Sequence, residues 1–98
     1  MSHQAIAIDF RRLIRHHPAA FHSPVHDELV VTQGERGTYF RLDATGKKIW
    51  ELIQTPKTVE DLCNELASEY RIERSVLEIE VLAFLADLER QDLIQVVR

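Results

Sequence analysis

Hydrophobic and polar residues alternate in short runs through the first half of the chain. Residues 28–33, ELVVTQ, are β-branched and apolar, and residues 38–42, TYFRL, alternate with a period of two, so both runs predict strands. The four residues between them, 34–37, carry glycine at both ends, which predicts an antiparallel hairpin. Residues 20–23 predict a weaker strand before this hairpin. The pattern therefore indicates three antiparallel strands ahead of the first helix.

The last of these strands divides its side chains between two faces, because successive side chains of a strand point in opposite directions. Thr38, Phe40 and Leu42 lie on one face, and Tyr39 and Arg41 lie on the other. Phe40 and Leu42 form the more apolar set, so we expect that face to turn toward the helices.

Helical spacing follows the strands. Asp43 or Thr45 can cap a helix that runs to about residue 54, where a Thr-Pro-Lys run breaks it. Thr58 opens a second helix to Tyr70 with a sequence, TVED, that resembles a capping box. The apolar residues that these two helices are expected to bury are Ile49, Trp50, Leu52, Ile53, Val59, Leu62, Leu66 and Tyr70.

The third predicted helix begins at Glu73 or Ser75 and runs to about residue 90. A helix that packs on one neighbour needs an apolar face of only about 100°. The apolar face of this helix is wider, so the helix is either covered on more than one side or leaves part of that face open to a partner. The short apolar tail 93–97, LIQVV, is expected to be extended and is compatible with packing back on the sheet. The helix has a central stripe of Leu77, Val81, Phe84, Leu85 and Leu88, widened by Val76, Ile79, Leu82, Ala83 and Ala86.

Length and composition indicate one small domain. The chain has 98 residues, 45% of them hydrophobic, which is enough for a small core. Its single cysteine, Cys63, excludes an internal disulfide framework and fits a reducing compartment. No apolar run approaches the roughly 20 residues that span a bilayer, and the N-terminus lacks the pattern of a signal peptide. We therefore expect a soluble, cytoplasmic protein that does not bind membranes.

Motifs for catalysis, cofactors or metals are not found in the sequence. It has no Gly-rich phosphate loop, and Cys63 falls within a predicted helix, where a small core residue is the simplest interpretation. Every histidine lies at or before His26, but Ser23 and Pro24 separate His22 from His26 and argue against a shared helical face. We expect no catalytic residue, no cofactor and no metal site.

The order of the elements predicts an α+β fold, a winged helix-turn-helix-like arrangement with a three-stranded antiparallel sheet followed by three helices. That architecture commonly binds DNA through a basic helix. Here the net charge is −4, and the third predicted helix carries five acidic residues against two arginines. Such a helix repels a phosphate backbone, so nucleic-acid binding is disfavoured, and a winged-helix DNA-binding regulator remains only as an alternative.

The segment 1–18 differs from the rest of the chain. It becomes basic toward Arg15 and stops at Pro18, and Phe10, Leu13 and Ile14 have helical spacing. We interpret residues 1–18 as an N-terminal arm, either flexible or used for docking or for a swapped homodimer, and residues 19–98 as the folded domain.

A set of residues spread over this domain occurs in a recognisable order and spacing. It resembles the signature of PqqD-like proteins, which are named after the D protein of pyrroloquinoline-quinone synthesis. Family members act as peptide chaperones, or recognition elements, for ribosomally made and post-translationally modified peptides (RiPPs). The resemblance covers residues 19–97. It rests on Gly37, Tyr39, Phe40, Leu42, Asp43, Gly46 and the run 49–53 (IWELI), then 58–62 (TVEDL), then Val81, Phe84, Leu85, Leu88 and 92–94 (DLI).

The resemblance implies that a leader segment of a precursor peptide adds as a fourth strand beside the third strand and lies against the third helix. In this mode the sheet edge supplies main-chain hydrogen bonds and side-chain pockets supply specificity. Some of the residues implied must belong to the core, and pattern alone does not separate core from groove. The peptide-binding residues implied are Thr38, Tyr39, Phe40, Arg41 and Leu42 on the strand, with Leu77, Glu80, Val81, Phe84, Leu85 and Leu88 on the helix.

The resemblance also implies a partner enzyme. In lasso-peptide clusters a stand-alone protein of this size hands the leader to a cysteine peptidase, and this subtype is favoured here. In pyrroloquinoline-quinone synthesis the partner is a radical-SAM enzyme, which stays open as an alternative. A subunit or homodimer that pairs through the sheet edge is a third possibility.

Overall fold

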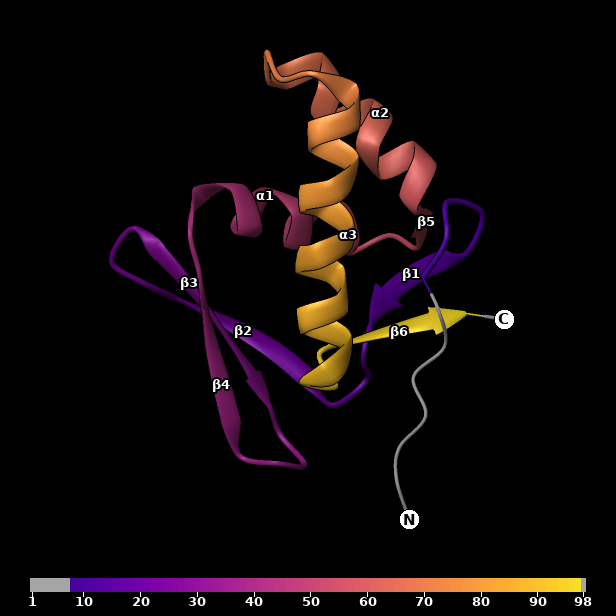
Figure 1. Ribbon diagram of the computed structural model, residues 1–98. Helices are drawn as coiled ribbons and strands as arrows, with labels where there is room; N and C mark the ends of the chain where they lie inside the picture. The colour runs from indigo at the N-terminus through magenta and orange to yellow at the C-terminus, as the bar shows by residue number, and fades with distance from the viewer. Residues whose placement is uncertain (1–7, 98) are drawn as a thin grey trace.

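The computed structural model describes residues 8–97 of the chain and contains two small sheets and three helices (Figure 1). Within these residues no helix is both long and apolar enough to cross a membrane. In chain order the elements are β1 (Leu13–His16), β2 (Ala20–Val25), β3 (Glu28–Gln33), β4 (Thr38–Leu42), α1 (Ala44–Leu52), β5 (Lys57–Thr58), α2 (Val59–Glu69), α3 (Arg74–Arg90) and β6 (Ile94–Val97).

Strands β2, β3 and β4 form the predicted three-stranded antiparallel sheet, in that order. Gly37 has a positive φ of 69° in the β3–β4 turn, a conformation that favours glycine. Leu29 and Val31 of β3 are 5% and 0% exposed, and their register partners on β4 are Leu42 and Phe40. The inner face of this sheet therefore belongs to the core, as the alternation predicted.

The three predicted helices are present, so the α+β, winged-helix-like fold class is confirmed. Asp43, rather than Thr45, caps α1, and its Oδ1 accepts a hydrogen bond from the backbone N–H of Gly46 at 2.7 Å. Thr58 caps α2, and its Oγ1 accepts from the N–H of Asp61 at 3.1 Å. In both cases a side-chain oxygen satisfies an amide that lacks a partner in the first helical turn.

A second antiparallel sheet, with strand order β5-β1-β6, joins the two ends of the described chain. Leu13 pairs with Val97, and Ile14, which is 0% exposed, pairs with Val96. Part of the segment interpreted as an N-terminal arm, 1–18, is thus a strand fixed in the domain; residues 1–7 of that segment lie outside the described residues. The tail also differs from expectation, because β6 pairs with β1 and not with the three-stranded sheet.

The helical spacing of Phe10, Leu13 and Ile14 does not produce a helix, because Phe10 lies in a turn and the other two residues lie in β1. In β1, Ile14 is buried while Leu13 is 41% exposed, so the strand has a period of two. The partner strand that selects this period is β6, the last element of the described chain, and local spacing carries no record of it.

Trp50 connects both sheets to α1. The residue is 1% exposed, and its ring stacks on the ring of His16 from β1, with a centroid distance of 3.6 Å and an interplanar angle of 11°. Nε2 of His16 donates to the backbone carbonyl oxygen of Trp50 at 2.8 Å. The indole Nε1–H in turn donates to Nδ1 of His22 on β2 at 3.0 Å. The prediction that Trp50 belongs to the core is confirmed.

This arrangement predicts that His16 makes stability depend on pH. Burial lowers the pKa of His16 from its ordinary value of 6.5, and the nearby charge of His22 lowers it further. The hydrogen bond to the Trp50 carbonyl raises the pKa but does not offset these effects. The unfolded chain therefore binds a proton at His16 more readily than the folded chain. The contribution of His16 is fully present above pH 6.5 and is lost as the pH falls from there through the folded pKa.

Urea denaturation between pH 5 and pH 8 measures this effect. We expect the free energy of unfolding of the wild type to fall more steeply below about pH 6.5 than that of His16→Gln, which cannot titrate at this position. Equal slopes for the two proteins would contradict the proposed role of His16.

Candidate functional site

Strand β4 lies at an edge of its sheet. It pairs with β3 on one side, and within residues 8–97 no strand pairs with its other side (Figure 1). An edge strand presents unpaired backbone N–H and C=O groups that can template another strand. The edge predicted to bind a peptide is therefore open in the described part of the chain.

Contacts near both ends of β4 hold the last turns of α3 beside this strand. At the β3–β4 turn, Arg36 forms an ion pair with Asp92 at 3.0 Å, and its Nη1 donates to the carbonyl oxygen of Arg90 at 3.2 Å. Beyond the other end of β4, the ring of Phe84 lies against Gly46 of α1. The segment from Phe84 to Asp92 therefore runs alongside β4 in the opposite direction (Figure 1).

Gly46 leaves room for the contact with Phe84. A Cβ atom added to Gly46 would lie 3.1 Å from Cζ of Phe84 and 3.3 Å from the capping Oδ1 of Asp43. The glycine thus lets Phe84 approach the start of α1, immediately after β4. Gly46 belongs to the family signature found in the sequence, but the sequence pattern did not indicate its contact with Phe84. Nothing in the sequence pattern indicated that Arg36 would bind the end of α3.

The predicted strand residues differ in how much surface they offer. Tyr39 is 72% exposed, Thr38 and Arg41 are also exposed, and Phe40 is half-buried, whereas Leu42 is 2% exposed. Arg41 also forms an ion pair with Glu28 of β3 at 3.7 Å on the outer face of the sheet. Phe40 and Leu42 both point to the side of the sheet where α3 lies. Phe40 keeps some accessible surface there, whereas Leu42 is a core residue.

The predicted helix residues fall into two groups. Leu77, Val81, Leu85 and Leu88 form the buried stripe of α3, with exposures between 0% and 4%. Glu80 is exposed and Phe84 is half-buried one turn further along the helix. The core and the accessible residues that pattern alone could not separate are therefore distinguished by the packing of α3, and a ligand beside β4 would meet Glu80 and Phe84 first.

Cys63 lies away from this edge and is fully buried in α2. Burial raises the pKa of its thiol, against the nearby charge of Arg74, which lowers it. A thiol held protonated in the core is a poor nucleophile. The interpretation of Cys63 as a small core residue agrees with this geometry.

These features define a class of protein: a small winged-helix-like α+β domain in which an edge strand, β4, is flanked by a helix. The chain belongs to the family of coenzyme PQQ synthesis protein D (PqqD), whose sequence model matches residues 28–94. The resemblance read from the sequence is thereby confirmed.

Two solved structures share the fold. TbiB1 in complex with the TbiA(beta) leader peptide is 31% identical, with a TM-score of 0.76 over 82% of this chain and 93% of that chain. Lasso peptide synthetase B1 complexed with the leader peptide is 23% identical, with a TM-score of 0.74 over 83% of this chain and 95% of that chain. No curated protein sequence matches the chain.

The division of α3 into core and accessible residues predicts different costs of truncation. Leu85→Ala removes a fully buried side chain and is expected to lower the free energy of unfolding by about 2–5 kcal/mol. Glu80→Ala on the exposed face is expected to change it by less than about 0.5 kcal/mol. Urea denaturation monitored by circular dichroism compares the two, and similar values for both variants would show that the assignment is wrong.

Proposed function

We propose that this protein binds the leader segment of a ribosomally synthesised precursor peptide by adding it as a strand beside β4. The observation that carries this proposal is the unpaired edge of β4 in a fold shared, at 31% identity, with a leader-peptide complex. Sheet extension would satisfy backbone groups of β4 that have no strand partner within residues 8–97. Main-chain hydrogen bonds of this kind provide affinity that depends little on sequence.

Specificity in this proposal comes from the side chains that the added strand would turn toward α3. Phe40 and Phe84 are both half-buried and face this side of β4 from the sheet and the helix. Apolar leader residues at alternate positions would pack on these two rings. Thr38 and Glu80 add polar contacts at the rim, while Tyr39 and Arg41 lie on the opposite face of the sheet.

The protein acts in this proposal as a non-catalytic chaperone that presents the leader to an enzyme. The thiol of Cys63 is buried in the core, away from the open edge. Peptide chemistry is therefore assigned to a partner. The likeness to TbiB1 and to lasso peptide synthetase B1 favours a leader peptidase as that partner, and a radical-SAM enzyme of the pyrroloquinoline-quinone type is the alternative.

Isothermal titration with the TbiA(beta) leader peptide, and with the leader of a precursor encoded near this chain, tests the proposal. Phe84→Ala is expected to weaken binding about tenfold or more, because the truncated ring loses its contact with an apolar leader side chain. Ile79→Ala is the matched control, since Ile79 is an apolar residue of the same helix that is 69% exposed. We expect that variant to bind as the wild type does.

Hydrogen exchange locates the peptide independently of any variant. Amides of residues 38–42 are expected to exchange more slowly with the leader bound, whereas those of residues 20–25, at the other edge of the same sheet, are expected to be unchanged. Absence of binding for both leaders at tens of micromolar, or protection at β2 in place of β4, would overturn the proposal.

A further inference from the structure

The outer face of the β5-β1-β6 sheet carries a group of side chains that the proposed function does not use. Leu13 and Val97 are register partners on β1 and β6, and Arg15 and Gln95 are the next pair on the same face. Arg11 and Arg12 precede β1. We call Arg11, Arg12, Leu13, Arg15 and Val97 the basic patch.

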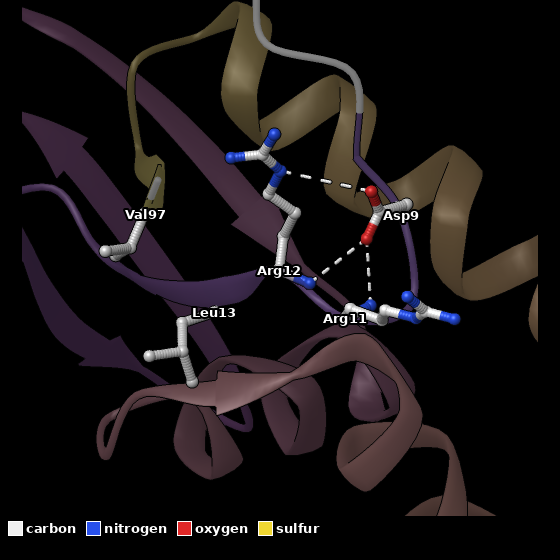
Figure 2. Close-up of a pocket in the computed structure, with 5 residues that line it drawn as sticks. All are labelled: Asp9, Arg11, Arg12, Leu13 and Val97. Atoms are coloured by element: carbon white, nitrogen blue, oxygen red, sulfur yellow. Dashed lines mark hydrogen bonds and ion pairs between the residues drawn. The ribbon is translucent and has the colours of Figure 1, made fainter.

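Part of the basic patch is a hollow with a volume of about 310 Å³, lined by Asp9, Arg11, Arg12, Leu13 and Val97 (Figure 2). Oδ1 of Asp9 accepts hydrogen bonds from the backbone N–H groups of Arg11 at 2.8 Å and Arg12 at 3.2 Å. Its Oδ2 lies 3.9 Å from Nε of Arg12. Asp9 thus fixes the backbone of this turn and pairs loosely with one of the arginines.

The other two arginines of the basic patch have no carboxylate partner within residues 8–97. Arg11 forms no ion pair there, and Nε of Arg15 donates to the neutral amide oxygen of Gln95 at 3.1 Å. The chain as a whole has a net charge of −4, so this excess of positive charge is local. Most other described cations are paired: Arg36–Asp92, Arg41–Glu28, Lys48–Glu69, Lys57–Glu65, Arg74–Glu78 and Arg90–Asp87.

The basic patch also lies apart from the edge of β4. In Figure 1, β1 and β6 are on the opposite side of α3 from β4. A peptide strand added beside β4 would therefore leave the basic patch uncovered. The two surfaces can be occupied at the same time by different ligands.

We propose that the basic patch binds an extended acidic segment of a partner protein, with carboxylates on both sides of one apolar residue. Guanidinium groups bind carboxylates through paired hydrogen bonds. Arg15 shares a face of β1 with Leu13, which is 41% exposed, and Val97 lies beside Leu13 on β6. Arg11 stands two residues before Leu13, in the turn that leads into β1. A strand-like segment places alternate side chains on one face, so an acidic, apolar, acidic order matches Arg11, the Leu13–Val97 pair and Arg15.

The same positive charge could attract an anionic membrane, but the geometry favours a protein segment. Membrane recognition by basic residues uses clusters of about four to eight Lys or Arg near a surface. The basic patch has three arginines, one of them beside Asp9, and two apolar side chains around a hollow. A hollow of this kind can receive a side chain of a partner protein, whereas insertion into a bilayer requires apolar side chains that protrude.

A capped synthetic peptide of alternating Glu and Leu residues, labelled for fluorescence anisotropy, is the probe for this proposal. A peptide with Gln in place of each Glu controls for the charge. The test pair of variants is Arg11→Glu with Arg15→Glu. The matched control is Lys47→Glu with Arg71→Glu, which makes the same change of net charge at two cations outside the patch that also form no ion pair within residues 8–97.

We expect the Glu peptide to bind the wild type in the micromolar to millimolar range, with affinity that falls as salt is added. The patch variant is expected to bind at least about tenfold more weakly, and the control variant within about twofold of the wild type. Amide chemical-shift changes should map to residues 9–15 and 94–97. Affinity for the TbiA(beta) leader should be the same in wild type and patch variant, which separates this proposal from the leader-binding proposal.

Four results would overturn the proposal. They are no binding of the Glu peptide at millimolar concentration, equal loss in both variants, equal affinity for the Glu and Gln peptides, and shift changes confined to β4. Vesicles of phosphatidylcholine with phosphatidylglycerol are tested in parallel. Vesicle binding that depends on Arg11 and Arg15, without peptide binding, would assign the basic patch to a membrane surface instead.

Discussion

The burial of Trp50 is the constraint on which the arrangement of this domain depends. A single indole receives the stacked ring of His16 from one sheet and donates its N–H to His22 of the other, while its own backbone belongs to α1. Because a buried indole N–H without a partner is costly, these contacts fix where the two sheets meet the helix. The orientation of β4, which leads directly into α1, follows from that junction.

The open edge of β4 is maintained by two contacts that do not involve the edge itself. Arg36 ties the β3–β4 turn to the end of α3, and Gly46 admits Phe84 against the start of α1. A strand held at both ends keeps a regular conformation without a neighbour on its free side. Rigid presentation of this kind would lower the ordering cost of the proposed binding, because only the peptide would have to become extended.

The distribution of charge and apolar surface separates two possible interfaces on a small molecule. Around β4 the accessible surface combines the rings of Tyr39, Phe40 and Phe84 with polar side chains such as Thr38 and Glu80. On the β1–β6 face the accessible surface is basic, although the chain is acidic as a whole. Surfaces of different chemistry would allow the two proposed ligands to bind without competing with each other.

Short stretches of sequence were enough to predict several elements: alternation defined the β3–β4 hairpin, and capping residues at Asp43 or Thr45 and at Thr58 marked two helix starts. These features depend on near neighbours in the chain, so their signals are local. The strand at residues 13–16 depends instead on long-range pairing, because its partner β6 lies at the opposite end of the described chain. Packing also decides which apolar residues of α3 are core: Val81 is 1% exposed and Phe84 is half-buried, and the apolar pattern does not distinguish them. Long-range packing selects among locally equivalent patterns, and that selection is not written in any short stretch of sequence.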